Sequence, residues 1–177
     1  VDKEMRYRQR YLDLIMNSEV RKTFHIRSKV ISLTRRFFED KGFLEVETPM
    51  MHPIAGGANA KPFLTHHNDL HHNMFLRISR ELFLKECIVG GFNRVYEIGK
   101  QFRNEGISRV HNPEFTSIEL YQAGTDYNEL MDMTEHLFEN MVLTINNSYI
   151  INWLDTEINL QGPYQRLDIM DTLLDQI

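Results

Sequence analysis

Two stretches of alternating polar and apolar residues, 95–103 and 117–121, constrain the fold of this chain more than any other feature. Successive side chains of a β-strand point to opposite faces, so this alternation predicts two strands joined by a flexible loop. The predicted core face carries Ile98, Phe102, Ile118 and Leu120, and the other face carries Gln101, Arg103, Ser117, Glu119 and Tyr121. Charged groups gathered on one face of a sheet suggest a binding or catalytic site.

Length and composition place the chain in a broad class. Its 177 residues are 42% hydrophobic and 25% charged, which is ordinary for a soluble globular domain with one hydrophobic core. The net charge of -5 predicts no bulk attraction to nucleic acid or to an anionic membrane. The single Cys87 excludes an internal disulfide framework, and no apolar run approaches the roughly 18 residues of a membrane span. We therefore expect a cytoplasmic protein without membrane association, and an organellar location stays open.

The first part of the chain reads as an arm followed by a helix and a strand. Residues 1–17 are rich in Arg and poor in branched apolar groups, which suggests a connecting arm, and residues 18–177 form the domain that follows. From Ser18 the apolar residues recur at helical spacing until Gly42, which predicts one long helix. Residues 43–49 then alternate like an edge strand that ends at Pro49.

Loops and helices alternate along the rest of the chain. Residues 50–74 are rich in Gly, Pro, His and Asn, which predicts a loop with one short strand around residues 63–65. Further expected elements are a helix over residues 80–89 capped by Ser79, a helix that begins at Asp126, one later strand, and a last helix over residues 170–177. Helices mixed with antiparallel strands, without a regular parallel-sheet rhythm, predict an α+β fold: an antiparallel sheet flanked by helices.

Arg103 is the charged residue of the hairpin with the most specific chemistry. Its forked guanidinium suits a phosphate or a carboxylate. The structural alternative is a cross-strand salt bridge with Glu119 or Glu97, which is the more common situation for an isolated Arg on a strand. Phe115 can likewise present its ring to a purine or pack in a core. Each residue taken alone is weak support for a site.

The order of the whole set resembles the class II aminoacyl-tRNA synthetases. Motif 2 of that class, here about residues 95–122, is matched by Phe102-Arg103-Asn104-Glu105 and Pro113-Glu114-Phe115-Thr116. The long helix, Gly42 and residues 45–49 resemble motif 1, about residues 24–50. Within the class, residues 103–108, 111–116 and 119–121 are similar to lysyl-tRNA synthetases, and further similar segments are residues 8–15, 56–58, 61–63, 65–68 and 89–92.

This resemblance implies a reaction and a set of site residues. Lysine and ATP would form lysyl-adenylate and pyrophosphate, and lysine would then pass to tRNA(Lys). Arg103 would be catalytic, bridging the lysine carboxylate and the α-phosphate of ATP. The implied ATP-binding residues are Arg103, Glu105, His111, Asn112 and Phe115, with Phe115 stacked on adenine. The implied lysine-binding residues are Gly57 and Glu81 for the α-ammonium, and Glu119 and Tyr121 for the ε-ammonium.

Some parts of the family pattern do not occur in this sequence. No Gly-rich motif 3 follows Thr116, so the residues that hold Mg²⁺ are expected outside this chain and no metal site within it. The histidines at 66, 67, 71 and 72 are not expected to form one, because adjacent residues of a strand face opposite ways and no Cys or acidic ligand spacing supports zinc. The anticodon-binding domain expected before the arm is also missing. We therefore expect the first half of a catalytic domain, inactive alone, that forms a homodimer through the motif 1 helix and strand.

Two departures from the family pattern lie close to the implied site. Ser79-Arg80 precedes Glu81 where the family has a small residue and Pro or Thr. We expect Arg80 to point to solvent from the start of its helix. The order of residues 108–111 also differs from the usual position of the loop cation, which leaves the role of that cation toward the ATP phosphates open.

Two other functions share part of this pattern. One is a lysine ligase that modifies an elongation factor, and the other is a non-catalytic fragment that only forms dimers or binds a partner. The arm at residues 8–15 favours the synthetase, because ligases of the first kind lack this arm.

Overall fold

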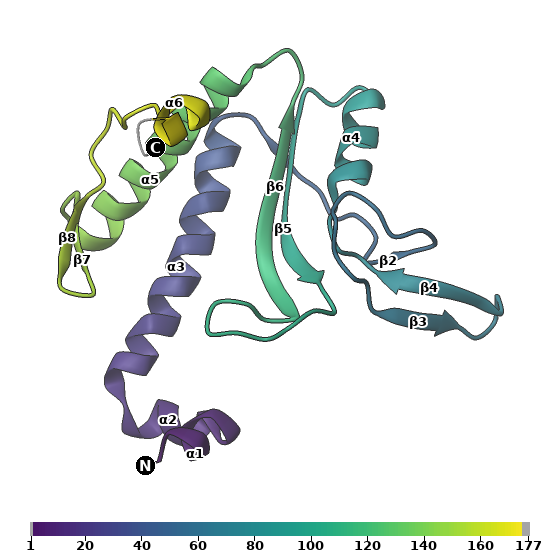
Figure 1. The fold of residues 1–177 in the computed structure, drawn as a ribbon, viewed down its shortest axis with the longest axis horizontal. Coiled ribbons are helices and arrows are strands. Elements are labelled where there is room, and N and C mark those ends of the chain that lie inside the picture. The colour runs from purple at the N-terminus through teal and green to yellow at the C-terminus, as the bar shows by residue number, and fades with distance from the viewer. Residues whose placement is uncertain (1, 175–177) are drawn as a thin grey trace. The chain divides into compact units, whose positions relative to one another are not determined.

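The computed structural model describes residues 2–174 (Figure 1). The chain divides into two compact units. The first combines the residues up to 37 with those from 126 onward, and the second is residues 38–125. Among the described residues, none of the helices is both long and apolar enough to cross a membrane.

The first unit is mainly helical. Its elements are α1 (Lys3–Arg8), α2 (Arg10–Met16), α3 (Ser18–Asp40, whose last turn belongs to the second unit), α5 (Tyr127–Asn146), β7 (Ile150–Trp153), β8 (Thr156–Asn159) and α6 (Ile169–Leu174). The long helix expected from Ser18 is confirmed as α3. The predicted Asp126 cap is also confirmed, because its carboxylate accepts hydrogen bonds from the backbone N of Asn128 (2.9 Å) and Glu129 (3.2 Å).

The end of the chain differs in part from the sequence prediction. Instead of one strand, β7 and β8 form an antiparallel hairpin, with Leu154 and Asp155 in left-handed conformations at its turn. β7 is mainly apolar, whereas β8 carries a single apolar residue, Ile158, so apolar alternation does not identify this second strand. The expected last helix is found as α6, and residues 175–177 of that prediction lie outside the described part of the chain.

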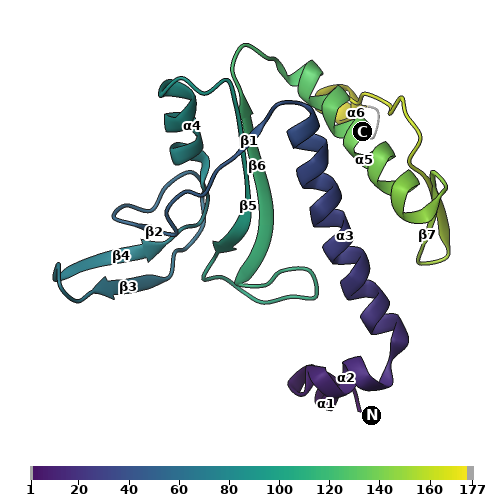
Figure 2. The same cartoon turned by 180° about the vertical axis from the view of Figure 1, so that it is seen from behind.

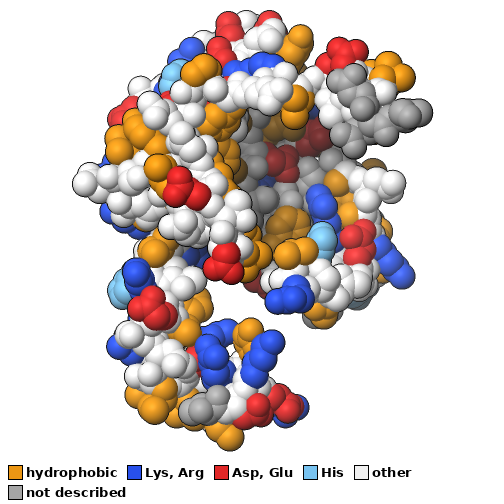
Figure 3. Space-filling model, turned by 60° about the vertical axis from the view of Figure 1, so that its left-hand side comes forward, with side chains coloured by type: hydrophobic (Ala, Val, Ile, Leu, Met, Phe, Trp, Pro, Cys, Tyr) orange, Lys and Arg blue, Asp and Glu red, His pale blue; other side chains and the backbone are white. Residues whose placement is uncertain are grey.

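The arm is folded around one buried carboxylate, Asp13. It accepts hydrogen bonds from Arg6 Nε (2.7 Å), Asn17 Nδ2 (2.5 Å) and the guanidinium of Arg10. Burial alone raises the pKa of Asp13, but these hydrogen bonds and the two cations outweigh burial and lower it. Outside this cluster, basic, acidic and apolar side chains are mixed on the surface of the arm (Figure 3).

The second unit contains two small sheets and one helix. Its elements are β1 (Leu44–Glu45), β2 (Met51–His52), β3 (Leu64–His67), β4 (His72–Leu76), α4 (Glu81–Val89), β5 (Arg94–Phe102) and β6 (Glu114–Gln122). One sheet has the order β1-β5-β6 and the other β2-β4-β3. The α4 helix lies alongside β5 and β6 in both ribbon views (Figures 1 and 2).

The predicted hairpin is confirmed as β5 and β6. The two strands pair antiparallel from Arg94 opposite Gln122 to Phe102 opposite Glu114. The edge strand β1 pairs parallel to β5, so this sheet is mixed rather than purely antiparallel. The α+β class itself is confirmed.

The prediction of a loop with one short strand around residues 63–65 is confirmed in part: residues 53–63 and 68–71 form no strand and β3 begins at Leu64, but β2 and β4 were not expected. β3 and β4 form a hairpin in which His67 lies opposite His72, and β2 adds to the other edge of β4. His71 adopts a left-handed conformation with φ 47° at the turn. β4 is short, and its exposed His72 and Asn73 are followed by three half-buried residues, so it lacks the alternation that the prediction relied on.

The polar face predicted for the hairpin is confirmed by its register. Glu97 lies opposite Glu119 and Gly99 lies opposite Ser117, so these residues share one face. Tyr96, on the other face, packs against Phe38 with ring centroids 5.3 Å apart. The predicted core residues of the hairpin (Ile98, Phe102, Ile118 and Leu120) are only half-buried, whereas Glu97 and Gln101 of the opposite face are buried.

Candidate active site

A buried ion pair underlies the polar face of the hairpin. Arg77 Nη1 lies 2.6 Å from Glu97 Oε1, and both side chains are almost completely buried. Glu97 also accepts hydrogen bonds from the backbone N (3.1 Å) and the hydroxyl (2.6 Å) of Thr48. The charge of Glu97 is therefore balanced inside the protein. Within residues 2–174 Arg103 makes no ion pair, so neither Glu97 nor Glu119 is its salt-bridge partner.

The expectation that Arg80 points to solvent is wrong. Its side chain is fully buried and its guanidinium donates to the backbone carbonyls of Glu97 (2.6 Å), Ser117 (2.9 Å) and Gly99 (2.9 Å). These carbonyls bind the cation because it stands at the start of α4, directly beside β5 and β6. Burial, followed by the charge of Arg77, lowers the pKa of Arg80.

Gly99 leaves room for the guanidinium of Arg77. A Cβ at this position would lie 2.7 Å from Arg77 Nη2, closer than van der Waals contact allows, but 3.8 Å from Arg80 Nη2, an ordinary contact. The absence of a side chain at Gly99 is thus a condition for the present position of Arg77 against the strand.

Glu119 is held by neutral donors instead of a cation. Ser79 Oγ lies 3.2 Å and 3.3 Å from its two carboxylate oxygens, and the backbone N of Arg80 lies 3.4 Å from one of them. Gln101 Nε2 completes the set. The sequence placed Gln101 on the same face as Glu119, but it did not reveal that Ser79 and Gln101 hold this carboxylate. Hydrogen bonds of this kind orient a carboxylate without cancelling its charge.

The other residues predicted to bind lysine lie around Glu119. Gly57 has φ +82°, and a Cβ there would meet Ser79 Oγ at 3.0 Å and Glu81 Cβ at 3.2 Å, so its backbone lies against these residues. Burial, followed by the charges of Glu81 and Glu119, raises the pKa of Tyr121 to about 12. The structure therefore brings Gly57, Glu81, Glu119 and Tyr121 into one region.

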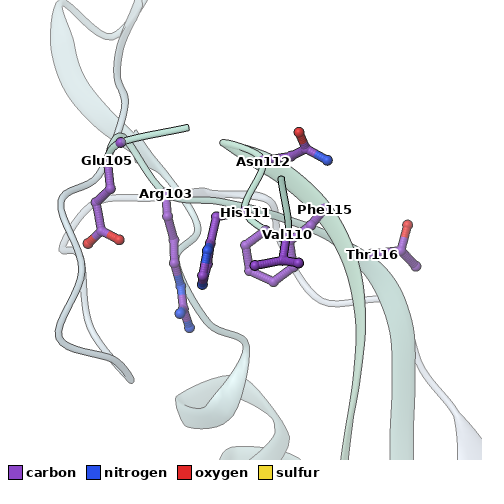
Figure 4. Close-up of a pocket in the computed structure, with 8 residues that line it drawn as sticks. Arg103, Glu105, Val110, His111, Asn112, Phe115 and Thr116 are labelled. Atoms are coloured by element: carbon purple, nitrogen blue, oxygen red, sulfur yellow. The ribbon is translucent and has the colours of Figure 1, made fainter. Parts of the chain in front are cut away.

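The loop end of the hairpin encloses a cavity of about 410 Å³. It is lined by Arg103, Glu105, Gly106, Val110, His111, Asn112, Phe115 and Thr116. Arg103 Cζ lies 5.4 Å from the ring centroid of Phe115, and Figure 4 shows Arg103 and His111 side by side. Arg103 Nε is buried and finds no hydrogen-bond acceptor among the described residues. A guanidinium in this state suits an anionic ligand.

Hydrogen bonds hold two of the predicted nucleotide-binding residues of this loop, one through Lys61 outside the loop and one within it. The carboxylate of Glu105 accepts a hydrogen bond from the backbone N of Lys61 (3.3 Å). Ser108 Oγ lies 2.8 Å from His111 Nδ1 and orients the ring. Asn112 lines the cavity, but its side chain points away from Arg103 and His111 in Figure 4.

Comparison with known proteins identifies the family to which the chain belongs. The profile of a family described as class II tRNA synthetases (D, K and N) matches residues 2–176. The chain therefore belongs to this family of class II tRNA synthetases.

Individual relatives narrow the comparison within this family. The chain is 66% identical to a lysine-tRNA ligase of Aliarcobacter butzleri over 97% of its own length and 34% of that protein. It is 58% identical to a lysine-tRNA ligase of Campylobacter jejuni and 55% identical to that of Carboxydothermus hydrogenoformans, each over 97% of this chain. The chain spans about a third of the length of these relatives.

Proposed function

We propose that the full-length protein carrying this chain is a lysine-tRNA ligase. It activates lysine with ATP to form lysyl-adenylate and pyrophosphate, and it transfers lysine to tRNA(Lys). Relatives that carry this name support the proposal, as they align with nearly the whole chain. In the structure, the observation that supports it best is Glu119, an ordered carboxylate held by neutral donors close to Glu81 and Tyr121.

Lysine differs from most amino acids in carrying two ammonium groups. We propose that Glu81 and the Gly57 backbone bind the α-ammonium and that Glu119 and Tyr121 bind the ε-ammonium. An amino acid without a side-chain cation would leave the carboxylate of Glu119 unpaired, which costs about 1–3 kcal/mol. Aspartate would add repulsion between two carboxylates.

The cavity at the loop end suits the ATP substrate. In the activation step the lysine carboxylate attacks the α-phosphorus, a P–O bond to pyrophosphate breaks, and pyrophosphate leaves with the electron pair. Arg103 holds the two anions together and offsets their repulsion, while Phe115 offers its ring face to adenine. The buried Arg103 Nε, which finds no acceptor within residues 2–174, supports this role. Glu105, His111 and Asn112 complete the proposed nucleotide site.

Mg²⁺ would neutralise phosphate charge during this step. Within residues 2–174, no group of three His, Cys, Asp or Glu side chains is placed to hold a metal ion. We therefore propose that the metal ligands belong to parts of the protein beyond this chain. We also propose a cytoplasmic homodimer that uses α3 and β1, with residues 1–17 as an arm and residues 18–177 as part of the catalytic domain.

Amino-acid-dependent ATP–pyrophosphate exchange by the full-length protein tests this proposal. Lysine is expected to stimulate the exchange, whereas aspartate and asparagine, the other substrates named by the family description, are expected to have no effect. Stimulation by aspartate or asparagine instead of lysine would overturn the assignment.

A second assay tests the acceptor. Radiolabelled lysine is expected to appear on tRNA(Lys) after incubation with ATP. Label transferred to an elongation factor in place of tRNA would favour the protein-modifying ligase.

A further inference from the structure

Lys85 places an ammonium group of the chain itself beside the proposed lysine site. It stands one helical turn after Glu81 on α4, and its Nζ lies 2.5 Å from Glu81 Oε1. The same Nζ lies 5.9 Å from the ring centroid of Tyr121 on β6. The Lys85 side chain therefore reaches from the helix toward the strand, and its ammonium lies close to two residues of the proposed site.

The chemistry of Lys85 matches that of the proposed ligand. Its terminal group is a primary alkylammonium, the same group that free lysine presents at its ε-position and closely similar to its α-ammonium. A carboxylate attracts such a cation through charge-assisted hydrogen bonds, and a Tyr ring attracts it through its π-face. Lys85 thus contacts the groups that the substrate needs.

The contact between Lys85 and Glu81 can open without disturbing the core. The side chains of Lys85 and Glu81 are 55% and 34% exposed, and an exposed pair on a flexible stem is weak. By contrast, the side chains of Arg77 and Glu97 are 1% and 4% exposed, so separating them would leave buried charges unpaired. Of Lys85 and Arg77, only Lys85 can readily separate from the carboxylate with which it is paired.

We propose that Lys85 is the resident counter-ion of the lysine site, an inference that rests on the proposed function. Its ammonium neutralises Glu81 while the site is empty and leaves this carboxylate when the α-ammonium of lysine binds. Two cations compete for one carboxylate, so Lys85 lowers the affinity for lysine. Arg80 does not compete in this way, because its guanidinium is bound to strand carbonyls.

An ordinary helix-surface pair is the alternative to this role. Glu followed four residues later by Lys stabilises a helix whatever the site nearby. For such a pair, removing the Lys side-chain charge leaves lysine binding unchanged. If Lys85 instead positions Glu81 for the substrate, removing the charge weakens lysine binding. Only the counter-ion role predicts tighter binding.

Calorimetric titration of the full-length protein with lysine separates these roles. Lys85→Met keeps the length of the side chain and removes its charge. This variant is expected to bind lysine about two- to fivefold more tightly, the competition expected of an exposed ion pair. Lys85→Arg, which can still pair with Glu81, is expected to stay close to the wild type. Lys22→Met on α3, which removes an exposed Lys paired with Glu19, is the matched control and is expected to leave binding unchanged.

The outcomes distinguish this inference from the proposed function. If the wild-type protein does not bind lysine, the proposed function fails and the role of Lys85 with it. If the wild type binds lysine but Lys85→Met binds it equally or more weakly, only the counter-ion role is overturned. Lys85→Gln provides a second neutral variant, and circular dichroism verifies that each variant is folded.

Discussion

The carboxylate of Glu119 and the guanidinium of Arg103 differ in how many hydrogen-bond partners they find within the protein. Glu119 already has three kinds of donor within the protein, from Ser79, Arg80 and Gln101. Arg103 has a buried Nε without an acceptor among the described residues and lies beside a cavity. Under the proposed function, the lysine side of the site is preformed, while the nucleotide side gains its hydrogen bonds only when an anion binds.

A second comparison lies within the hairpin itself. Glu97 and Glu119 face each other across β5 and β6, yet only Glu97 forms an ion pair with Arg77. The charge of Glu97 is neutralised by Arg77, so this carboxylate contributes to the structure. The charge of Glu119 is not neutralised by its neutral donors, so this carboxylate can still pair with a cationic ligand. The partner of each carboxylate, rather than its position in the strand, therefore distinguishes their roles.

The largest effect is expected from Glu97→Gln. This change leaves the buried Arg77 guanidinium without a counter-charge, so we expect a loss of about 3–5 kcal/mol in the free energy of unfolding. Urea denaturation of the full-length protein measures it. The exposed pair of Lys100 and Glu114 offers a control, because Glu114→Gln is expected to change stability by less than about 1 kcal/mol. Equal losses in both variants would contradict the structural role of Glu97.

Arg103→Ala tests the nucleotide side of the comparison. Removing the cation that offsets charge in the transition state is expected to lower the rate of ATP–pyrophosphate exchange about 10²–10³-fold. Stability is expected to change little, because Arg103 makes no ion pair within residues 2–174. A loss of folding with unchanged exchange per folded molecule would show that Arg103 is structural instead.

Ser79→Ala tests how far the lysine side is preformed. The Ser79 hydroxyl donates to Glu119 and accepts from the backbone N of Glu81 (3.1 Å), so its removal affects both acids. We expect lysine affinity to fall about three- to tenfold, or about 0.7–1.4 kcal/mol, which is within the range for a typical hydrogen bond. Steady-state exchange kinetics are expected to show a higher KM for lysine with an unchanged KM for ATP. A change in the KM for ATP alone would contradict the assignment of Ser79 to the lysine site.

The smallest effect concerns Tyr121. Its pKa is raised from 10.0 to about 12 by burial and then by the charges of Glu81 and Glu119. The protonated hydroxyl therefore contributes stability that is full below about pH 10 and is lost as the pH rises toward 12. A difference titration of tyrosinate absorbance between the wild type and Tyr121→Phe is expected to show one group that ionises near pH 12. Ionisation near pH 10 would show that neither burial nor the two carboxylates raise the pKa of this hydroxyl.

Local sequence patterns predicted much of the fold. The alternation in β5 and β6 and the helical spacing in α3 depend on neighbouring residues, and both elements were found where expected. The Asp126 cap is equally local. β3 was expected around residues 63–65, but its partner β4 was missed because this short strand begins with two exposed polar residues and shows no alternation.

Contacts between distant segments could not be predicted in this way. Arg77 is paired with Glu97 twenty residues later, and Arg80 lies on carbonyls of two strands. An Arg at the start of a helix is usually exposed, so local reasoning gave the wrong position for Arg80. Gly57, Glu81, Glu119 and Tyr121 were expected from the resemblance to a known family, and the structure brings them together. The donors that hold Glu119 come from distant segments, so only the three-dimensional structure reveals them.

The most direct test of this account is calorimetric titration of lysine into the full-length protein and its Glu119→Gln variant. Glu119 is proposed to select the ε-ammonium, so the variant is expected to bind lysine at least about tenfold more weakly, the equivalent of about 1.4 kcal/mol. It is also expected to lose the preference of the wild type for lysine over norleucine, which lacks the ε-ammonium. Glu114→Gln is expected to bind like the wild type. Unchanged lysine affinity and selectivity in Glu119→Gln would contradict the proposal that this carboxylate binds the ε-ammonium of lysine.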